Sequence, residues 1–249
     1  MSGHSKWSTI KRKKGAADAQ RSKTWAKLLR FVEVAAREGG GNVDSNPTLA
    51  TAVQKAKSNS VTNDNITRAI KRGTGELQGE SYEEVSYEGY GPGGIAVLVR
   101  CLTSNRNRAA QDVRSMFNGN GGKMAEPGSV AWMFETKGVI VVAKDSMSEE
   151  DAFLVAVDAG AEDVRASDES VEVVTPPDQL KAVQDALEGA GAEVESADLT
   201  EVPKTTIAIE GADAKKVLNL VDALEELDDV QDVYANFDIS DDVLASLAT

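Results

Sequence analysis

Few side chains in this 249-residue chain have the chemistry of a catalytic or metal site. The only histidine is His4 and the only cysteine is Cys101. No neighbour in sequence would orient His4 as an acid or base, so a phosphate or backbone contact is expected of it. Cys101 lies in an apolar stretch typical of a buried thiol, and one His with one Cys gives no zinc spacing. The sequence therefore predicts no catalytic residues, no metal ligands and no cofactor.

Cations near the start of the chain are the residues whose type and spacing suggest a function. The run from Lys11 through Arg12 and Lys13 to Lys14 follows closely on Lys6 and Trp7. Cations of this density can neutralise nucleic-acid phosphates and gain affinity by releasing counterions. Trp7 could stack on an unpaired base, which is typical of single strands, or it could anchor the segment on the domain that follows.

The net charge of −14 is divided unevenly along the chain. Residues 1–75 hold 15 Lys or Arg and five Asp or Glu, a net charge of +10, whereas residues 76–249 hold 12 and 36, a net charge of −24. This asymmetry favours binding of a polyanion by the N-terminal part, with an acidic remainder that keeps the protein soluble. The alternative is that the cationic part docks on the chain's own acidic domains.

The first helix must position part of this positive charge. Residues 1–17 show no apolar period and are interpreted as a basic arm that orders on its partner. Residues 18–38 are predicted to form a helix, because their apolar side chains recur with helical spacing. Lys23, Lys27, Arg30 and Arg37 fall on the opposite side, so they form either a cationic ridge continuous with the arm or an ordinary solvated face.

Two further short helices complete a helical domain, residues 18–75. Asn46 and Pro47 have the residue types of an N-cap and first helical position. The helix after Thr62 ends near Gly73, and its last turn carries Arg68, Lys71 and Arg72. The helix dipole favours cations there, so no ligand is needed to explain them.

The rest of the chain alternates between strand and helix patterns. Residues 136–203 follow the order β-α-β-β-α-β, the ferredoxin-like unit. Residues 80–135 lack a second helix and a closing strand, which 204–240 could supply. We therefore predict an α+β protein with two ferredoxin-like domains, the one at 136–203 inserted into a discontinuous domain of 80–135 plus 204–240. The tail is 241–249. Strands are expected at 129–134 and 205–209.

A second group of cations lies where the helix after residue 105 begins. Arg106 and Arg108 alternate there with Asn105 and Asn107. A helix N-terminus disfavours cations but attracts anions, so this turn could contact phosphate. Plain capping by Asn105, with salt bridges to the acidic half, explains the same residues.

Several motifs together resemble one known family. They are 3–7 (GHSKW), 35–40 (AAREGG), 65–75 (NI-x-RAIKRGTG), 87–94 (YEGYGPGG) and 105–108 (NRNR). These segments, in this order, are similar to the YebC/PmpR family of probable transcriptional regulators, whose mitochondrial relatives are translational activators. The resemblance implies a helical domain followed by two α/β domains. It also implies a cytoplasmic, non-enzymatic protein that binds DNA or acts at the ribosome.

The sequence also limits location and partners. No apolar run reaches the roughly 20 residues of a membrane span, the N-terminus lacks the apolar core of a secretory signal, and a single Cys suits a reducing cytoplasm. No membrane partner is expected. The oligomeric state is left open, and a monomer is compatible with the sequence.

These observations predict a regulator of gene expression that binds nucleic acid without catalysis, here a transcriptional regulator binding DNA. A ribosome-binding or rRNA-binding translation factor is the alternative, and a metal-dependent nuclease built from carboxylates is a third hypothesis. The expected nucleic-acid-binding residues are Lys6, Trp7, Lys11, Arg12, Lys13, Lys14, Arg21, Lys23, Lys27, Arg30, Arg37, Arg106 and Arg108.

Overall fold

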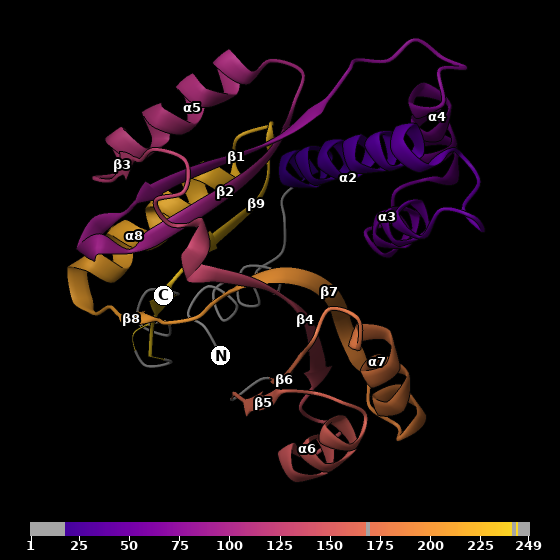
Figure 1. Cartoon of the computed structure of the whole chain (residues 1–249), viewed down its shortest axis with the longest axis vertical. Coiled ribbons are helices and arrows are strands. Elements are labelled where there is room, and N and C mark those ends of the chain that lie inside the picture. Colours follow the sequence, from indigo (N-terminus) through magenta and orange to yellow (C-terminus); the bar gives the residue numbers. More distant parts are fainter. Residues whose placement is uncertain (1–17, 168–169, 241–242, 244–249) are drawn as a thin grey trace. The chain divides into compact units, whose positions relative to one another are not determined.

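The computed structural model of the protein (Figure 1) describes residues 18–167, 170–240 and 243, and side chains from residue 22 onward. The chain forms two compact units. One consists of residues 212–233 with the described part of 10–129, and the other consists of 130–211 with the described residues from 234 on. Helices and antiparallel sheets are both present, so the predicted α+β class is confirmed.

Three helices open the first unit. They are α2 (Asp18–Gly39), α3 (Pro47–Ser58) and α4 (Asn63–Gly73). The predicted apolar side of α2 is buried at Val32, Ala35 and Ala36, where it packs with buried residues of α3 and α4. Burial of this stripe is what holds helices of such length together, since isolated short helices are marginal in water.

Local signals determine the start of α3 as predicted. Pro47 occupies the first turn, and Asn46 Oδ1 accepts a hydrogen bond from Leu49 N at 3.1 Å. The Asn46 amide also donates to Ala35 O at 2.8 Å and is 4% exposed. This one side chain therefore caps α3 and ties it to α2.

The same unit continues with a four-stranded sheet of order β3-β1-β2-β9. Its elements are β1 (Glu83–Tyr90), β2 (Ala96–Thr103), α5 (Arg106–Gly119), β3 (Lys123–Met124), α8 (Gly211–Glu225) and β9 (Val230–Ala235). β1 and β2 pair antiparallel from Glu83↔Thr103 to Tyr90↔Ala96. Both helices lie over the face on which a Cβ at Gly89 or Gly91 would point. A Cβ added at Gly89 would meet Phe117 of α5, and one added at Gly91 would meet Leu220 of α8.

The second unit contains the βαββαβ arrangement predicted for 136–203. Its elements are β4 (Phe134–Ala143), α6 (Glu149–Asp158), β5 (Asp163–Ala166), β6 (Ser170–Thr175), α7 (Leu180–Gly189) and β7 (Val194–Pro203). The strand order is β5-β6-β4-β7 with antiparallel pairing throughout. Buried residues of α6 and α7 pack with Ile140, Val142, Val171 and Val173, so both helices lie on one face, as in a ferredoxin-like domain.

Two predicted strands differ from the structure. Residues 129–133 are not a strand: Ala131–Met133 form a 3-10 turn, and β4 starts at Phe134. Met133 N donates to Val130 O at 2.9 Å, so a local turn takes the donor that a strand ladder would need. Of 205–209, only Ile207–Ala208 (β8) is strand, and it pairs in parallel with β10 (Phe237–Asp238) in a separate two-stranded sheet.

Candidate nucleic-acid interface

The predicted cationic stripe of α2 makes contacts within the protein. Lys27 Nζ donates to Glu225 O at 2.6 Å, and Lys23 Nζ lies 3.5 Å from Glu226 O. Both acceptors are main-chain oxygens at the C-terminal end of α8, where a helix has unsatisfied carbonyls and partial negative charge. The stripe therefore supplies cations to the end of another helix, which is the docking alternative that the charge asymmetry left open.

Arg30 extends these contacts to the sheet. Its Nη1 lies 2.7 Å from Asp228 O, 3.1 Å from Leu102 O and 3.4 Å from Asp229 Oδ1. The guanidinium carbon also lies 4.9 Å from the ring centroid of Tyr82. Two carbonyls, a carboxylate and an aromatic face thus surround a side chain that is 16% exposed, so Arg30 is an internal tie between α2 and the β2 and β9 region.

Asp229 is the centre of a buried polar cluster. The residue is 7% exposed, and its carboxylate accepts from Thr103 Oγ1 at 2.9 Å and from Arg108 Nη2 at 2.9 and 3.2 Å. The hydrogen bond to Asp229 raises the pKa of the Arg108 guanidinium. A buried carboxylate needs such partners, because desolvation without them costs several kcal/mol.

Glu33 plays the corresponding part inside the helical domain. The residue is 2% exposed, and its carboxylate accepts hydrogen bonds from Arg37 Nη2 at 3.2 Å and from Arg72 Nε at 2.8 Å. Arg37 also donates to Glu80 O at 2.7 Å. Next to this cluster, a Cβ on Gly73 would lie 2.3 Å from Glu33 O, so the α2–α4 approach requires glycine there.

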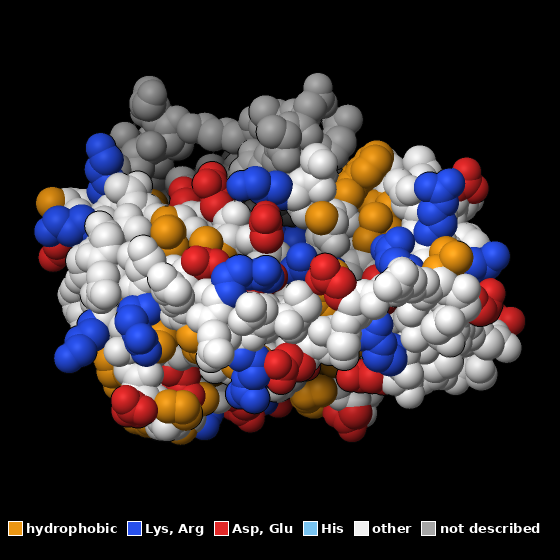
Figure 2. All heavy atoms as spheres, turned by 90° about the horizontal axis from the view of Figure 1, so that it is seen from above, with side chains coloured by type: hydrophobic (Ala, Val, Ile, Leu, Met, Phe, Trp, Pro, Cys, Tyr) orange, Lys and Arg blue, Asp and Glu red, His pale blue; other side chains and the backbone are white. Residues whose placement is uncertain are grey.

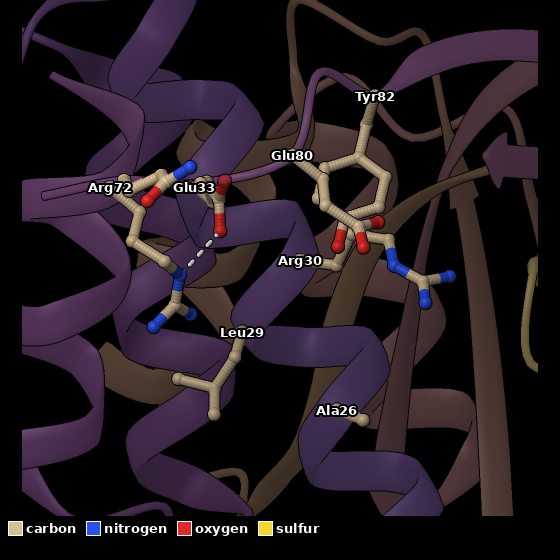
Figure 3. A pocket seen from close by; sticks show the side chains of 9 residues that line it. Ala26, Leu29, Arg30, Glu33, Arg72, Glu80 and Tyr82 are labelled. Atoms are coloured by element: carbon tan, nitrogen blue, oxygen red, sulfur yellow. Dashed lines mark hydrogen bonds and ion pairs between the residues drawn. The ribbon is translucent and has the colours of Figure 1, made fainter. Parts of the chain in front are cut away.

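A cleft of about 530 Å³ lies between these two clusters. In Figure 3, Arg72 reaches toward Glu33, while Tyr82 and Arg30 lie together on the other side of the opening. A second cleft, of about 600 Å³, shares Arg30, Glu80 and Tyr82 with the first and extends to Asp112 and Glu226. Burial is the main cause that raises the pKa of Tyr82, so its hydroxyl keeps its proton to a higher pH than an exposed tyrosine does.

The predicted contact at the start of α5 is a helix cap with ion pairs. Asn105 caps the helix by accepting from Arg108 N at 3.1 Å. Arg106 pairs with Glu83 at 3.6 Å, and both side chains are at least half exposed. An exposed pair of this length contributes little to stability, so Arg106 can exchange partners at low cost, whereas Arg108 is bound to Asp229.

Several predicted residues lie outside the part of the chain whose side chains the structure describes. They are Lys6, Trp7, Lys11, Arg12, Lys13, Lys14 and Arg21. Of the predicted residues with described side chains, the structure brings Arg30 and Arg108 together on Asp229. It places Arg37 on Glu33 and Arg106 on Glu83 instead.

Other cations have no partner among the described residues, and the sequence reasoning did not select them. Arg68 and Lys71 are exposed on α4, whose buried face is formed by Ile66, Ala69 and Gly73. At 100° per residue the two cations lie about 60° apart, on one outward strip of the helix. The helical period of α4 is a sequence signal for this strip, whereas the helix dipole accounts for cations in the last turn without a ligand. Figure 2 shows Lys and Arg interspersed with Asp and Glu on the face that it presents.

Neither a metal cluster nor a membrane span occurs in the described part of the chain. No group of three or more His, Cys, Asp or Glu that could hold a metal ion is found among these residues. Within the same residues, no helix combines the length and the apolarity that crossing a bilayer requires.

The fold and charges define a class of protein: α+β, with a cationic helical part followed by an acidic sheet-bearing remainder. Comparison with known proteins gives the family. Residues 5–76 match the model of the TACO1/YebC protein N-terminal domain, and residues 82–237 match that of the TACO1/YebC second and third domain. The chain belongs to the TACO1/YebC family, so the resemblance found from sequence motifs is confirmed.

Similar proteins cover almost the whole chain. A "Probable transcriptional regulatory protein" of Salinispora arenicola is 55% identical over 99% of this chain and 100% of its own length. One of the same name from Thermotoga maritima is 52% identical over 97% of this chain and 95% of its own. The crystal structure of a conserved hypothetical protein from Aquifex aeolicus has a TM-score of 0.82 and 46% identity, covering 91% of this chain and 94% of that one.

Proposed function

We propose that this protein regulates transcription by binding DNA, without catalysing a reaction. The observation that carries the proposal is the charge division, in which residues 1–75 hold a net charge of +10 within a protein of net charge −14. Its relatives named as probable transcriptional regulatory proteins support a regulatory role. Protein surfaces that meet phosphate backbones are cationic, while acidic surfaces elsewhere discourage non-specific contacts.

Within this proposal the phosphate contacts divide between two regions. The basic arm, with Lys11, Arg12, Lys13 and Lys14, supplies the densest charge. Arg68 and Lys71 on α4 supply two exposed cations that have no partner in the described structure. Lys27, Arg30 and Arg37 contribute indirectly, because they donate from α2 to the main-chain oxygens of Glu225, Asp228 and Glu80 and so hold the helix in place. In this proposal the arm and the α4 strip, Arg68 and Lys71, make the direct phosphate contacts.

A salt titration tests the proposal with matched variants. Charge reversal of Lys11, Arg12, Lys13 and Lys14 to Glu is expected to abolish binding of a labelled duplex. The double variant Arg68→Ala and Lys71→Ala is expected to weaken binding for all sequences and to reduce the salt slope by about 2, one for each phosphate that is no longer neutralised. The control Lys144→Ala and Lys181→Ala removes two cations from the acidic domain and should bind as the parent does.

The physiological nucleic acid is identified by crosslinking in cells followed by sequencing of the bound fragments. Promoter DNA supports the proposal. Predominant recovery of ribosomal RNA would replace it with the translation alternative, which the same cationic surfaces could serve. Magnesium-dependent cleavage of the labelled duplex would contradict the absence of catalysis.

A further inference from the structure

One helix of the ferredoxin-like domain at 136–203 presents a hydrophobic surface to solvent. Phe153, Leu154 and Val157 of α6 are 50%, 58% and 43% exposed. At 100° per residue these three side chains fall within about 100° of arc. The opposite side of the same helix is the one that packs in the core, through Ala152 and Ala156. We call the exposed triad of Phe153, Leu154 and Val157 the α6 face.

Acidic residues surround the α6 face. Glu150 lies on the same arc, one turn before Leu154 and two turns before Val157, and Glu149 and Asp158 flank the arc on its two sides. The helix, from Glu149 to Asp158, contains no Lys or Arg. A partner that covers the apolar triad must therefore also meet carboxylates at its rim.

The rest of this domain strengthens the negative field. Residues 136–203 hold 17 Asp or Glu and four Lys or Arg, a net charge of −13. Lys137 pairs with Glu162 at 2.8 Å, Arg165 with Asp163 at 2.6 Å, and Lys181 with Asp185. Lys144 donates to Ser167 O at 2.5 Å. All four cations thus already have acceptors within the domain, and the sequence of the domain leaves a net excess of 13 negative charges.

We propose that the α6 face binds a basic, amphipathic protein segment, with apolar side chains on Phe153, Leu154 and Val157 and with Lys or Arg at the acidic rim. Charge selects this occupant. A second copy of the domain would bring another net charge of −13 against the first, and nucleic acid or an anionic membrane would be repelled in the same way. A cationic helix with an apolar stripe satisfies both parts of the surface.

This inference does not depend on the proposed function, because it concerns a different domain and the opposite charge. It gives the protein two surfaces of complementary chemistry: one for a polyanion, one for a basic protein. Basic segments are common in proteins that themselves bind nucleic acid, so the two contacts suit a single assembly.

The test uses the full-length protein and an 18-residue helical peptide of Leu and Lys, labelled with fluorescein and followed by anisotropy. The triple variant Phe153→Gln, Leu154→Gln and Val157→Gln keeps every charge and is expected to weaken binding at least tenfold. Its control, Val43→Gln with Leu77→Gln, alters apolar residues that are 36% and 44% exposed in the other unit and should leave affinity unchanged. Since all five side chains are exposed, thermal unfolding midpoints are expected to stay near that of the parent.

Two peptide controls sharpen the outcome. A Leu/Glu peptide of the same pattern should not bind, and a scrambled Leu/Lys peptide without an apolar stripe should bind weakly to parent and triple variant alike. Equal binding by the triple variant and the parent overturns the proposal, because charge alone would then explain the affinity. Sedimentation that shows a dimer of the parent but not of the triple variant assigns the face to a second copy and also overturns it.

The basic arm of this chain is another segment that could occupy the α6 face. A peptide with the sequence of residues 4–17 that binds the α6 face as tightly as the Leu/Lys peptide would assign the face to an intramolecular partner and refute the proposal. Nucleic-acid affinity of the triple variant is measured in parallel. An unchanged value, together with the absence of peptide binding, separates this inference from the proposed function.

Discussion

The guanidinium of Arg30 donates to the main-chain oxygen of Asp228 at 2.7 Å, across 198 residues of sequence. Lys27 Nζ donates in the same way to Glu225 O. Two cations of α2 therefore bind main-chain oxygens at and just after the C-terminal end of α8. Because α8 and β9 come late in the chain, these contacts join the helical domain to the C-terminal segment that completes the first sheet.

Replacing Arg30 with Met should lower the free energy of unfolding by about 1–3 kcal/mol. Methionine keeps much of the aliphatic bulk but removes the donor that Arg30 supplies to two carbonyls and to Asp229, and such losses cost about this much when the groups are partly buried. Urea unfolding measures the change. Arg114→Met is the matched control, because Arg114 is exposed on α5 and has no partner in the described structure, and an equal loss in both variants would contradict the tie.

Asp229→Asn tests the buried cluster by removing charge while keeping shape. We expect a loss of about 2 kcal/mol, since hydrogen bonds to charged groups are worth about 1.5–3 kcal/mol. Arg108 is 53% exposed, so Arg108→Ala alone should cost less than Asp229→Asn. The double variant should lose less than the sum of the two, with a coupling of at least about 0.5 kcal/mol. Strict additivity in this cycle would show that the two residues act separately.

Gly73→Ala should destabilise the helical domain by about 1–3 kcal/mol. The added methyl would lie 2.3 Å from Glu33 O and 2.8 Å from Ala36 Cβ, and backbone atoms must move apart to admit it. Gly119→Ala is the control, because nothing lies within 4 Å of its Cβ position at the end of α5. That change should be neutral or slightly stabilising. Thermal unfolding measures both variants, and an equal unfolding midpoint for the two would contradict the close α2–α4 approach.

Cys101 should be inert toward alkylation in the folded protein. It is fully buried, and burial, with Asp229 as the second cause, raises the pKa of its thiol from 9.0 to about 12. Three pKa units reduce the reactive thiolate at pH 8 about a thousandfold, before burial limits access further. Mass spectrometry after iodoacetamide treatment should show labelling only in denaturant, and labelling of the native protein at the same rate would refute the burial.

The pKa of Cys101 also gives a direction for stability at high pH. Above pH 9 the unfolded chain loses the thiol proton while the folded chain keeps it until about pH 12. The unfolded state therefore binds fewer protons, and the free energy of unfolding falls with rising pH in this interval. A Cys101→Ala variant should show a shallower decline over that range.

Local structure was predictable because its causes are local. Asn46 caps α3 and Asn105 caps α5, as their sequence positions indicate. The strand predicted at 129–134 was wrong for the complementary reason. The apolar residues there are compatible with a strand or with a turn. Hydrogen bonds between neighbouring residues, such as Met133 N to Val130 O, stabilise the turn.

The sequence by itself determined the class of fold, the helical periods and the separation of charge between the two parts of the chain, because composition and spacing are properties of neighbouring residues. Only the tertiary structure decided which cations are engaged within the protein. Lys27, Arg30 and Arg37 look alike in the sequence to Arg68 and Lys71, yet the first three meet carbonyls and carboxylates that are distant in sequence or one helical turn away. Whether a cationic side chain is engaged within the protein depends on the acceptors that the fold places next to it. Helical spacing indicates only the side of the helix on which the side chain lies.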